Sequence, residues 1–151
     1  MRKALVLAAR VALGGVFLYA ASTKLHPPLS ISLSLFALQI DSYQLLPPWA
    51  VGALAHTLPW LEAALGLALL TGWQLRYVAS VTSALLVGFF SVMLRTHLKG
   101  MAIECGCFGP NEKLGVGTLV RDGTLMAVSL GLTVAAFLSP RKASSPHHGQ
   151  P

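Results

Sequence analysis

The segment 77-YVASVTSALLVGFFSVML-94 contains no charged residue. As a helix, a run of this length crosses the ~30 Å hydrocarbon core of a bilayer. Three further apolar blocks accompany it in the chain. We therefore predict an all-α integral membrane bundle in one domain over residues 1–139, with transmembrane helices at about 4–21, 51–70, 77–94 and 118–138.

The composition supports a membrane protein. Of the 151 residues, 54% are hydrophobic and only 11% are charged, whereas soluble domains carry about 25% charged residues. The net charge is +6, but the basic residues stand singly or in pairs at the ends of the apolar blocks. That distribution suits lipid headgroups and membrane topology. We expect a lipid bilayer as a partner and no nucleic acid.

The first block also has features of a signal peptide, with a basic start and the small residues Ala20-Ala21-Ser22 at its end. Because Arg10 interrupts its apolar core, we expect this helix to be retained. The segment 25–48 is bounded by two proline pairs, and its apolar residues recur every three to four positions. Serine alternation there also fits a strand, but an open strand edge at a membrane is unsatisfied. We predict a short interfacial helix.

The basic residues near the first helix predict how the helices are oriented across the membrane. Four helices place both termini on one face, and basic residues are evenly divided between the two faces. Arg2 and Lys3, next to the first helix, favour a cytoplasmic N-terminus. The prediction is a multi-pass protein of the bacterial inner membrane with cytoplasmic termini and a periplasmic loop between the last two helices. The polar tail 140–151 is expected to be disordered.

That loop contains Cys105-Gly106-Cys107. The central glycine lets the backbone turn tightly enough to bring two sulfur atoms together. A disulfide across one residue is strained, and strained disulfides tend to be reducible and catalytic. We interpret Cys105 and Cys107 as a catalytic redox pair. A static disulfide, idle thiols, or a metal site with Met101 or His97 remain alternatives.

Four polar residues lie within or beside the apolar blocks. Glu62 sits in the middle of the second block, where an acid costs about 2.5–3.5 kcal/mol to insert. Arg10 is expected at a similar depth in the first helix, so we predict an Arg10–Glu62 ion pair. Asp122 is placed in the first turn of the last helix, where a negative charge suits the helix dipole. A contact of Asp122 with the cysteine loop or with Lys24 is the alternative.

The sequence resembles the methylamine-utilisation MauE proteins, a branch of the wider DoxX-like four-helix membrane proteins. The matching features, which span about residues 5 to 138, are Arg10 to Lys24, Tyr43-Gln-Leu-Leu-Pro47, Pro59-Trp-Leu-Glu62, Cys105-Gly-Cys-Phe-Gly109 and Arg121-Asp122.

The resemblance implies a helper in maturing a periplasmic quinoprotein amine dehydrogenase, such as methylamine dehydrogenase, whose small subunit is rich in disulfides. Such helpers act with a thioredoxin-like partner. Carried over by position, Cys105 and Cys107 are the exchanging pair, and Glu62 and Lys24 are family-typical polar positions.

We therefore predict the membrane component of a thiol–disulfide relay that supports a disulfide-rich periplasmic client. The alternatives are a non-enzymatic scaffold or small-molecule carrier with a pocket at Glu62, and a Cu(I) site at the Cys105/Cys107 loop. No cofactor is expected, with a quinone or Cu(I) left open.

Overall fold

The computed structural model describes residues 1–101, 103–104 and 113–138. This part of the chain contains five helices and no strand: α1 (Arg2–Lys24), α2 (Leu29–Ser42), α3 (Pro48–Thr71), α4 (Leu75–Leu98) and α5 (Val116–Leu138). The all-α prediction and the predicted short helix after the first span are confirmed. Cys105, Cys107 and the tail 140–151 lie outside the described residues.

Proline and glycine set the boundaries of α3. Pro48 begins the helix, where the missing N–H costs nothing and the fixed φ suits the first turn. Gly72 ends it with φ at +74°, a left-handed conformation that glycine adopts without strain. The Gly72 N–H donates to the carbonyl oxygen of Ala68 at 2.9 Å. α3 continues through Pro59, so the proline does not end the helix.

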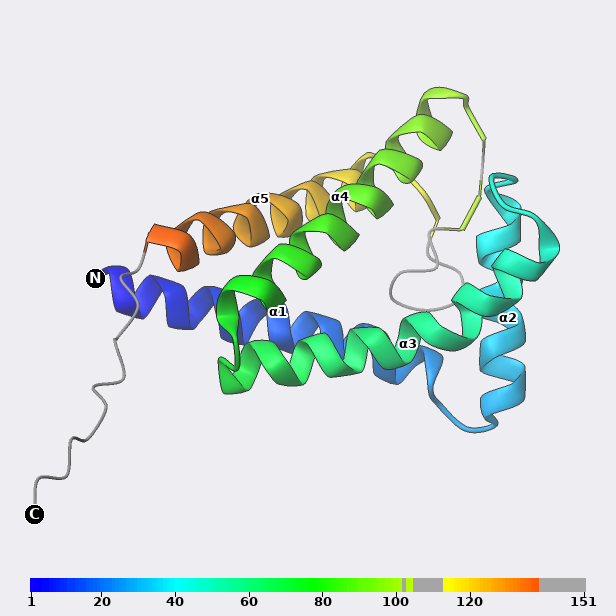
Figure 1. The fold of residues 1–151 in the computed structure, drawn as a ribbon. Coiled ribbons are helices and arrows are strands. Elements are labelled where there is room, and N and C mark those ends of the chain that lie inside the picture. The colour runs from blue at the N-terminus through cyan, green and yellow to red at the C-terminus, as the bar shows by residue number, and fades with distance from the viewer. Residues whose placement is uncertain (102, 105–112, 139–151) are drawn as a thin grey trace, which may run out of the picture.

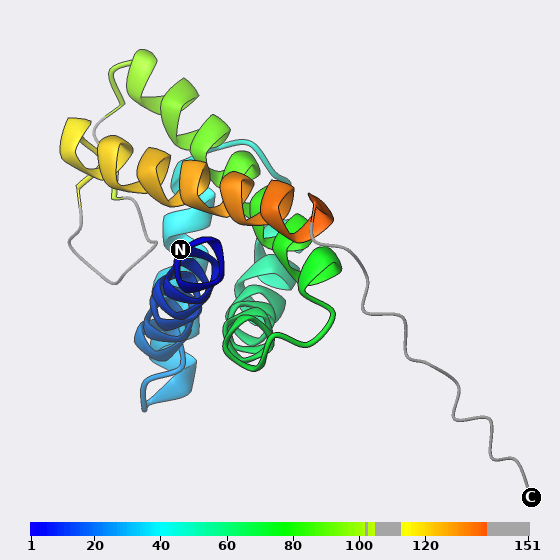
Figure 2. The same cartoon turned by 90° about the vertical axis from the view of Figure 1, so that its left-hand side faces the viewer.

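The helices form two antiparallel pairs (Figure 1). α1 packs along α3 and α4 packs along α5, and these are the two most extensive contacts. The pairs diverge towards the end where α2 lies across the bundle, packed on α3 and α1. Viewed after a 90° turn, α4 and α5 again lie together above α1 and α3 (Figure 2). The start of α1 and the end of α5 share the opposite end of the bundle.

Two glycines allow α1 and α3 to approach closely. A Cβ added at Gly14 would lie 3.0 Å from the carbonyl oxygen of Gly66, and one added at Gly66 would lie 3.0 Å from that of Gly14. Small residues at such crossings are typical of helix packing in membranes, where close van der Waals contact replaces the hydrophobic effect.

Hydroxyl groups join α4 to α5. The Ser83 hydroxyl lies 2.7 Å from that of Ser129 and 2.9 Å from that of Thr133. Ser83 and Ser129 are buried. Hydrogen bonds between membrane helices contribute about 0.6 kcal/mol each on average, so this cluster holds the pair together modestly.

Four of the helices, all except α2, are long and apolar enough to cross a membrane. Large apolar side chains such as Leu67, Val81 and Val134 point outwards and are exposed in the isolated chain. A bilayer covers such surfaces, so the chain is a membrane protein, as predicted. Every membrane helix extends beyond its predicted bounds, by up to four residues at an end.

Candidate functional site

A buried ion pair joins the end of α1 to the middle of α3. The Lys24 Nζ donates to Glu62 Oε2 at 3.0 Å and to Oε1 at 3.3 Å. Lys24 is the last residue of α1, and it also donates to the carbonyl oxygen of Ala20 at 3.2 Å. Lys24 is 4% exposed and Glu62 7%. At this burial each charge depends on the other for compensation.

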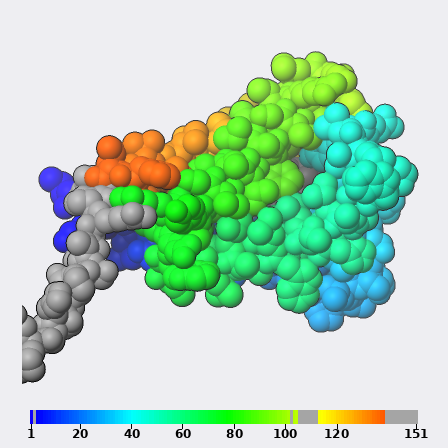
Figure 3. Space-filling model, in the orientation of Figure 1, coloured from blue at the N-terminus to red at the C-terminus, as the bar shows by residue number. Residues whose placement is uncertain are grey.

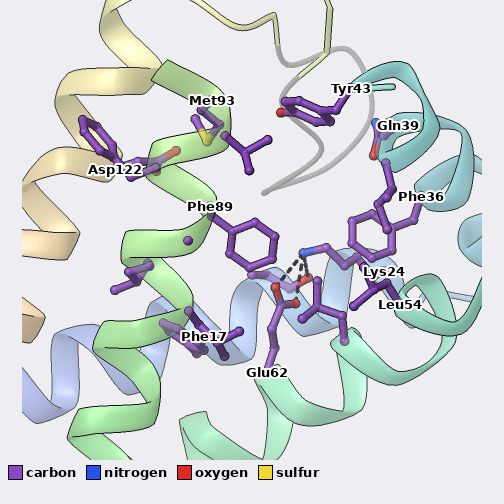
Figure 4. A pocket seen from close by; sticks show the side chains of 18 of the residues that line it. Phe17, Lys24, Phe36, Gln39, Tyr43, Leu54, Glu62, Phe89, Met93 and Asp122 are labelled. Carbon is purple, nitrogen blue, oxygen red and sulfur yellow. Dashed lines mark hydrogen bonds and ion pairs between the residues drawn. The ribbon is translucent and has the colours of Figure 1, made fainter. Parts of the chain in front are cut away.

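Aromatic residues surround the charged groups. The Lys24 Nζ lies 5.0 Å from the centroid of the Phe36 ring, within the range of a cation–π contact. Phe36 belongs to α2, so the short helix contributes directly to the site. In the close-up, Phe36 and Phe89 lie on either side of the Lys24–Glu62 pair as viewed there (Figure 4).

The ion pair forms part of the wall of a cavity of about 390 Å³. All five helices contribute to the lining, and most of the lining residues are apolar. The cavity lies where the two helix pairs diverge, and the surface is hollowed between α4 and α2 (Figure 3). Its polar lining residues are Lys24, Gln39, Tyr43, Glu62 and Asp122.

Asp122 is the second buried acid of this cavity, 7% exposed. Its Oδ1 forms an ion pair with the Nε of the neighbouring Arg121 at 3.0 Å, and its Oδ2 accepts from Nη2 at 3.3 Å. Because α5 begins at Val116, Asp122 lies beyond the first turn, and the predicted first-turn position is wrong. The predicted benefit from the helix dipole therefore does not apply, since that effect is confined to the first turn.

The segment that carries the cysteines begins and ends at described residues. Glu104 and Lys113 form an antiparallel bridge, and the Leu114 N–H donates to the carbonyl oxygen of Ile103 at 2.9 Å. The Gln39 amide donates to Glu104 Oε2 at 3.3 Å. Since Gln39 lines the cavity, the residue immediately before Cys105 is tied to the cavity wall.

Arg10 lies elsewhere, and the predicted Arg10–Glu62 ion pair is wrong. Its Nε donates to the carbonyl oxygen of Leu69 at 2.9 Å, and its Nη2 to that of Leu70 at 3.0 Å. The last carbonyls of a helix have no partner within the helix, so a guanidinium at the end of α3 satisfies them. Glu62 is eight residues earlier in α3, about 12 Å along the axis.

Lys24 takes the place predicted for Arg10. The structure thus unites Lys24, Glu62 and Asp122 in one cavity and leaves Arg10 outside it. Gln39, Phe36 and Phe89 were not identified from the sequence. Gln39 carried a usable signal, because it is a polar residue within the apolar 3–4 pattern of the predicted short helix. Phe36 and Phe89 gave no such signal in the sequence, because aromatic residues are common in membrane helices.

No group of three or more His, Cys, Asp or Glu side chains arranged to hold a metal ion occurs within residues 1–101, 103–104 and 113–138. His97 and Met101 are described, whereas the cysteines considered with them as Cu(I) ligands are outside this range.

The fold and the site define a class: a small four-span membrane protein with a buried ion pair at an intramembrane cavity. The family described as "Methylamine utilisation protein MauE" matches residues 2–136 of the chain. The chain therefore belongs to the MauE family and is a membrane protein of the methylamine-utilisation type. No curated protein and no solved structure matches the chain significantly.

Proposed function

We propose that the protein is the membrane component of a thiol–disulfide relay supporting maturation of a disulfide-rich periplasmic protein, such as a quinoprotein amine dehydrogenase. Membership of the MauE family supports the client class. The observation that carries the relay is the Glu104–Lys113 bridge beside the cavity, because it brackets the segment holding Cys105 and Cys107.

In this proposal the protein lies in the inner membrane with its N-terminus in the cytoplasm. The described part of the chain supports a common face for the α1–α2 connection and the two flanks of the cysteine segment, because both lie at the end where α2 crosses the bundle (Figure 1). The basic residues Arg2 and Lys3 at the other end favour the cytoplasm. The cysteine segment then faces the periplasm.

The exchange step involves a thioredoxin-like partner. A partner thiolate attacks one sulfur of the Cys105–Cys107 disulfide and forms a mixed disulfide, releasing the other cysteine as a thiolate. The partner's second thiolate then attacks the mixed disulfide. The partner leaves oxidised by two electrons, and Cys105 and Cys107 are left as a reduced pair. Run backwards, the same steps reduce the partner.

Replacing one cysteine tests the relay. With Cys107→Ser or Cys105→Ser, the remaining thiolate can still attack the disulfide of an oxidised partner, which is the exchange run backwards, but the chain has no second cysteine to resolve the mixed disulfide. We therefore expect an adduct with a periplasmic thioredoxin-fold protein to accumulate. Non-reducing gels of cells trapped with acid, followed by mass spectrometry, detect the adduct. The Cys105→Ser/Cys107→Ser double variant is the matched control and should give none. Full client maturation in the double variant would refute the relay.

A carrier of small molecules is the second candidate, and the cavity at Glu62 favours it. In that case Glu62→Gln, which removes the charge but keeps the shape, should impair client maturation more than Cys105→Ser does. Asp41→Asn is the control, because Asp41 is exposed on α2. A relay predicts the reverse order, with loss of maturation in Cys105→Ser and a smaller effect of Glu62→Gln per folded chain. Because Glu62→Gln also removes one partner of the buried ion pair, the yield of active client enzyme is compared per amount of folded chain in the membrane.

A further inference from the structure

The cavity has the size and lining of a ligand site inside the membrane. Its volume of about 390 Å³ lies within the ~300–1,000 Å³ typical of small-molecule sites. Leu58 and Phe89 line it from the interior of α3 and α4 rather than from their ends. A ligand at this depth lies among apolar side chains within the bundle, which favours a lipid-soluble molecule.

The walls favour a flat ring. Phe17, Phe36 and Phe89 line the cavity together with Tyr43. Aromatic side chains stack on planar groups in offset or edge-to-face arrangements. An acyl chain would use the apolar lining but not this set of rings.

The charges favour a neutral headgroup that carries oxygen. Glu62 and Asp122 are both buried at the cavity, and each already forms an ion pair, with Lys24 and Arg121 respectively, so a carboxylate or phosphate headgroup would have to compete with these acids for their cations. A carbonyl can accept a hydrogen bond from Lys24 in exchange for one of that residue's bonds to Glu62. A hydroxyl can donate to the Glu62 carboxylate. A molecule that interconverts between these two forms fits both partners of the ion pair.

We propose that this cavity binds the ring of a membrane-soluble quinone. The inference deepens the proposed relay and rests on it for its redox step. There, the thiols of Cys105 and Cys107 lose two electrons and two protons and form one sulfur–sulfur bond. The quinone gains the same two electrons and two protons and leaves as the quinol, with two new O–H bonds. The Gln39–Glu104 hydrogen bond places the start of the cysteine segment at the cavity wall.

Two glycines on membrane helices provide a matched test. Gly88 lines the cavity, whereas Gly131 on α5 does not, and both are exposed in the isolated chain. A Cβ added at either position meets nothing within 4 Å. The first side-chain atom therefore fits at both sites, and only Gly88→Leu places the rest of its side chain at the cavity.

The experiment measures binding of ubiquinone with one isoprene unit to the purified full chain in detergent. All variants carry Cys105→Ser and Cys107→Ser, so no thiol chemistry contributes. We expect saturable binding of one quinone per chain, weakened about tenfold or more by Gly88→Leu, equivalent to at least ~1.4 kcal/mol, and unchanged by Gly131→Leu. The double variant Lys24→Met/Glu62→Leu, which is expected to keep most of the stability, should also weaken binding, with Lys3→Met as the control for the loss of a lysine elsewhere.

Absence of saturable binding, or equal affinities for Gly88→Leu and Gly131→Leu, would overturn the quinone site. Phospholipid that stays bound and is not displaced by the quinone would overturn it too. These results are separable from failure of the relay. A mixed disulfide that forms without quinone binding refutes the cavity proposal alone, and quinone binding without any mixed disulfide refutes the relay alone.

Discussion

Lys24 and Glu62 bring opposite charges into a part of the molecule where a lone charge is expensive. Their 3.0 Å contact lies among apolar and aromatic side chains. Breaking a buried ion pair by removing one partner costs about 3–5 kcal/mol, whereas replacing both partners with apolar residues is often neutral. The pair is therefore sensitive to single changes, whichever function it serves.

Lys24→Met should lower the stability of the protein by about 3–5 kcal/mol because it leaves Glu62 buried without its counter-charge. The double variant Lys24→Met/Glu62→Leu should recover most of that loss. Unfolding of the purified protein in mixed micelles, followed by circular dichroism, measures both. Lys3→Met is the control, since Lys3 is exposed. If the double variant were as unstable as the single one, the ion pair would not be the cause.

At the scale of helices, α1 and α3 depend on their glycine contact. A Cβ at Gly66 would lie 2.9 Å from Leu18 Cγ as well as 3.0 Å from the carbonyl oxygen of Gly14. Gly66→Val should therefore force the helices apart and destabilise the protein by about 1–3 kcal/mol. At Gly15, one position along α1 from Gly14, nothing lies within 4 Å.

Gly15→Val is accordingly the matched control and should change the unfolding midpoint far less than Gly66→Val. The same unfolding measurement compares them. Equal shifts would mean that helix propensity, rather than the close approach of α1 and α3, explains the loss.

The helices themselves were predictable because long apolar blocks have few other solutions in a bilayer. The ends of the helices were harder to predict, because hydropathy marks only the apolar part of a helix. It misses polar residues that continue the helix, such as Lys24. The wrong partner for Glu62 has another cause, because the adjacent ends of α1 and α3 are not level. Arg10 lies eight residues into α1 yet bonds the carbonyl oxygens of Leu69 and Leu70 at the end of α3. The start of α1 therefore extends beyond α3, and Glu62 faces the other end of α1, where Lys24 lies.

The full lining of the cavity could not be predicted from the sequence, for a different reason. A pocket at Glu62 was predicted, but its other walls come from helices far apart in the chain, and their convergence depends on how the two helix pairs diverge. Gln39 and Phe89 become neighbours of the site only through that geometry.

At the scale of the whole molecule, the two ends of the helix bundle differ. The start of α1 and the end of α5 lie at one end, and α2, the cavity and the flanks of the cysteine segment gather at the other (Figure 1). In the proposed orientation the second end faces the periplasm, where paired thiols are used in oxidised form. The relay thus requires cysteines that are outward-facing and reducible.

The most direct measurement is thiol labelling of intact cells with a bulky, membrane-impermeant maleimide, with and without prior mild reduction. We expect Cys105 and Cys107 to be labelled only after reduction, as an outward-facing, labile disulfide. The Cys105→Ser/Cys107→Ser variant controls for background labelling. Labelling of both cysteines only after cell lysis, without any reductant, would place free thiols in the cytoplasm and contradict the relay.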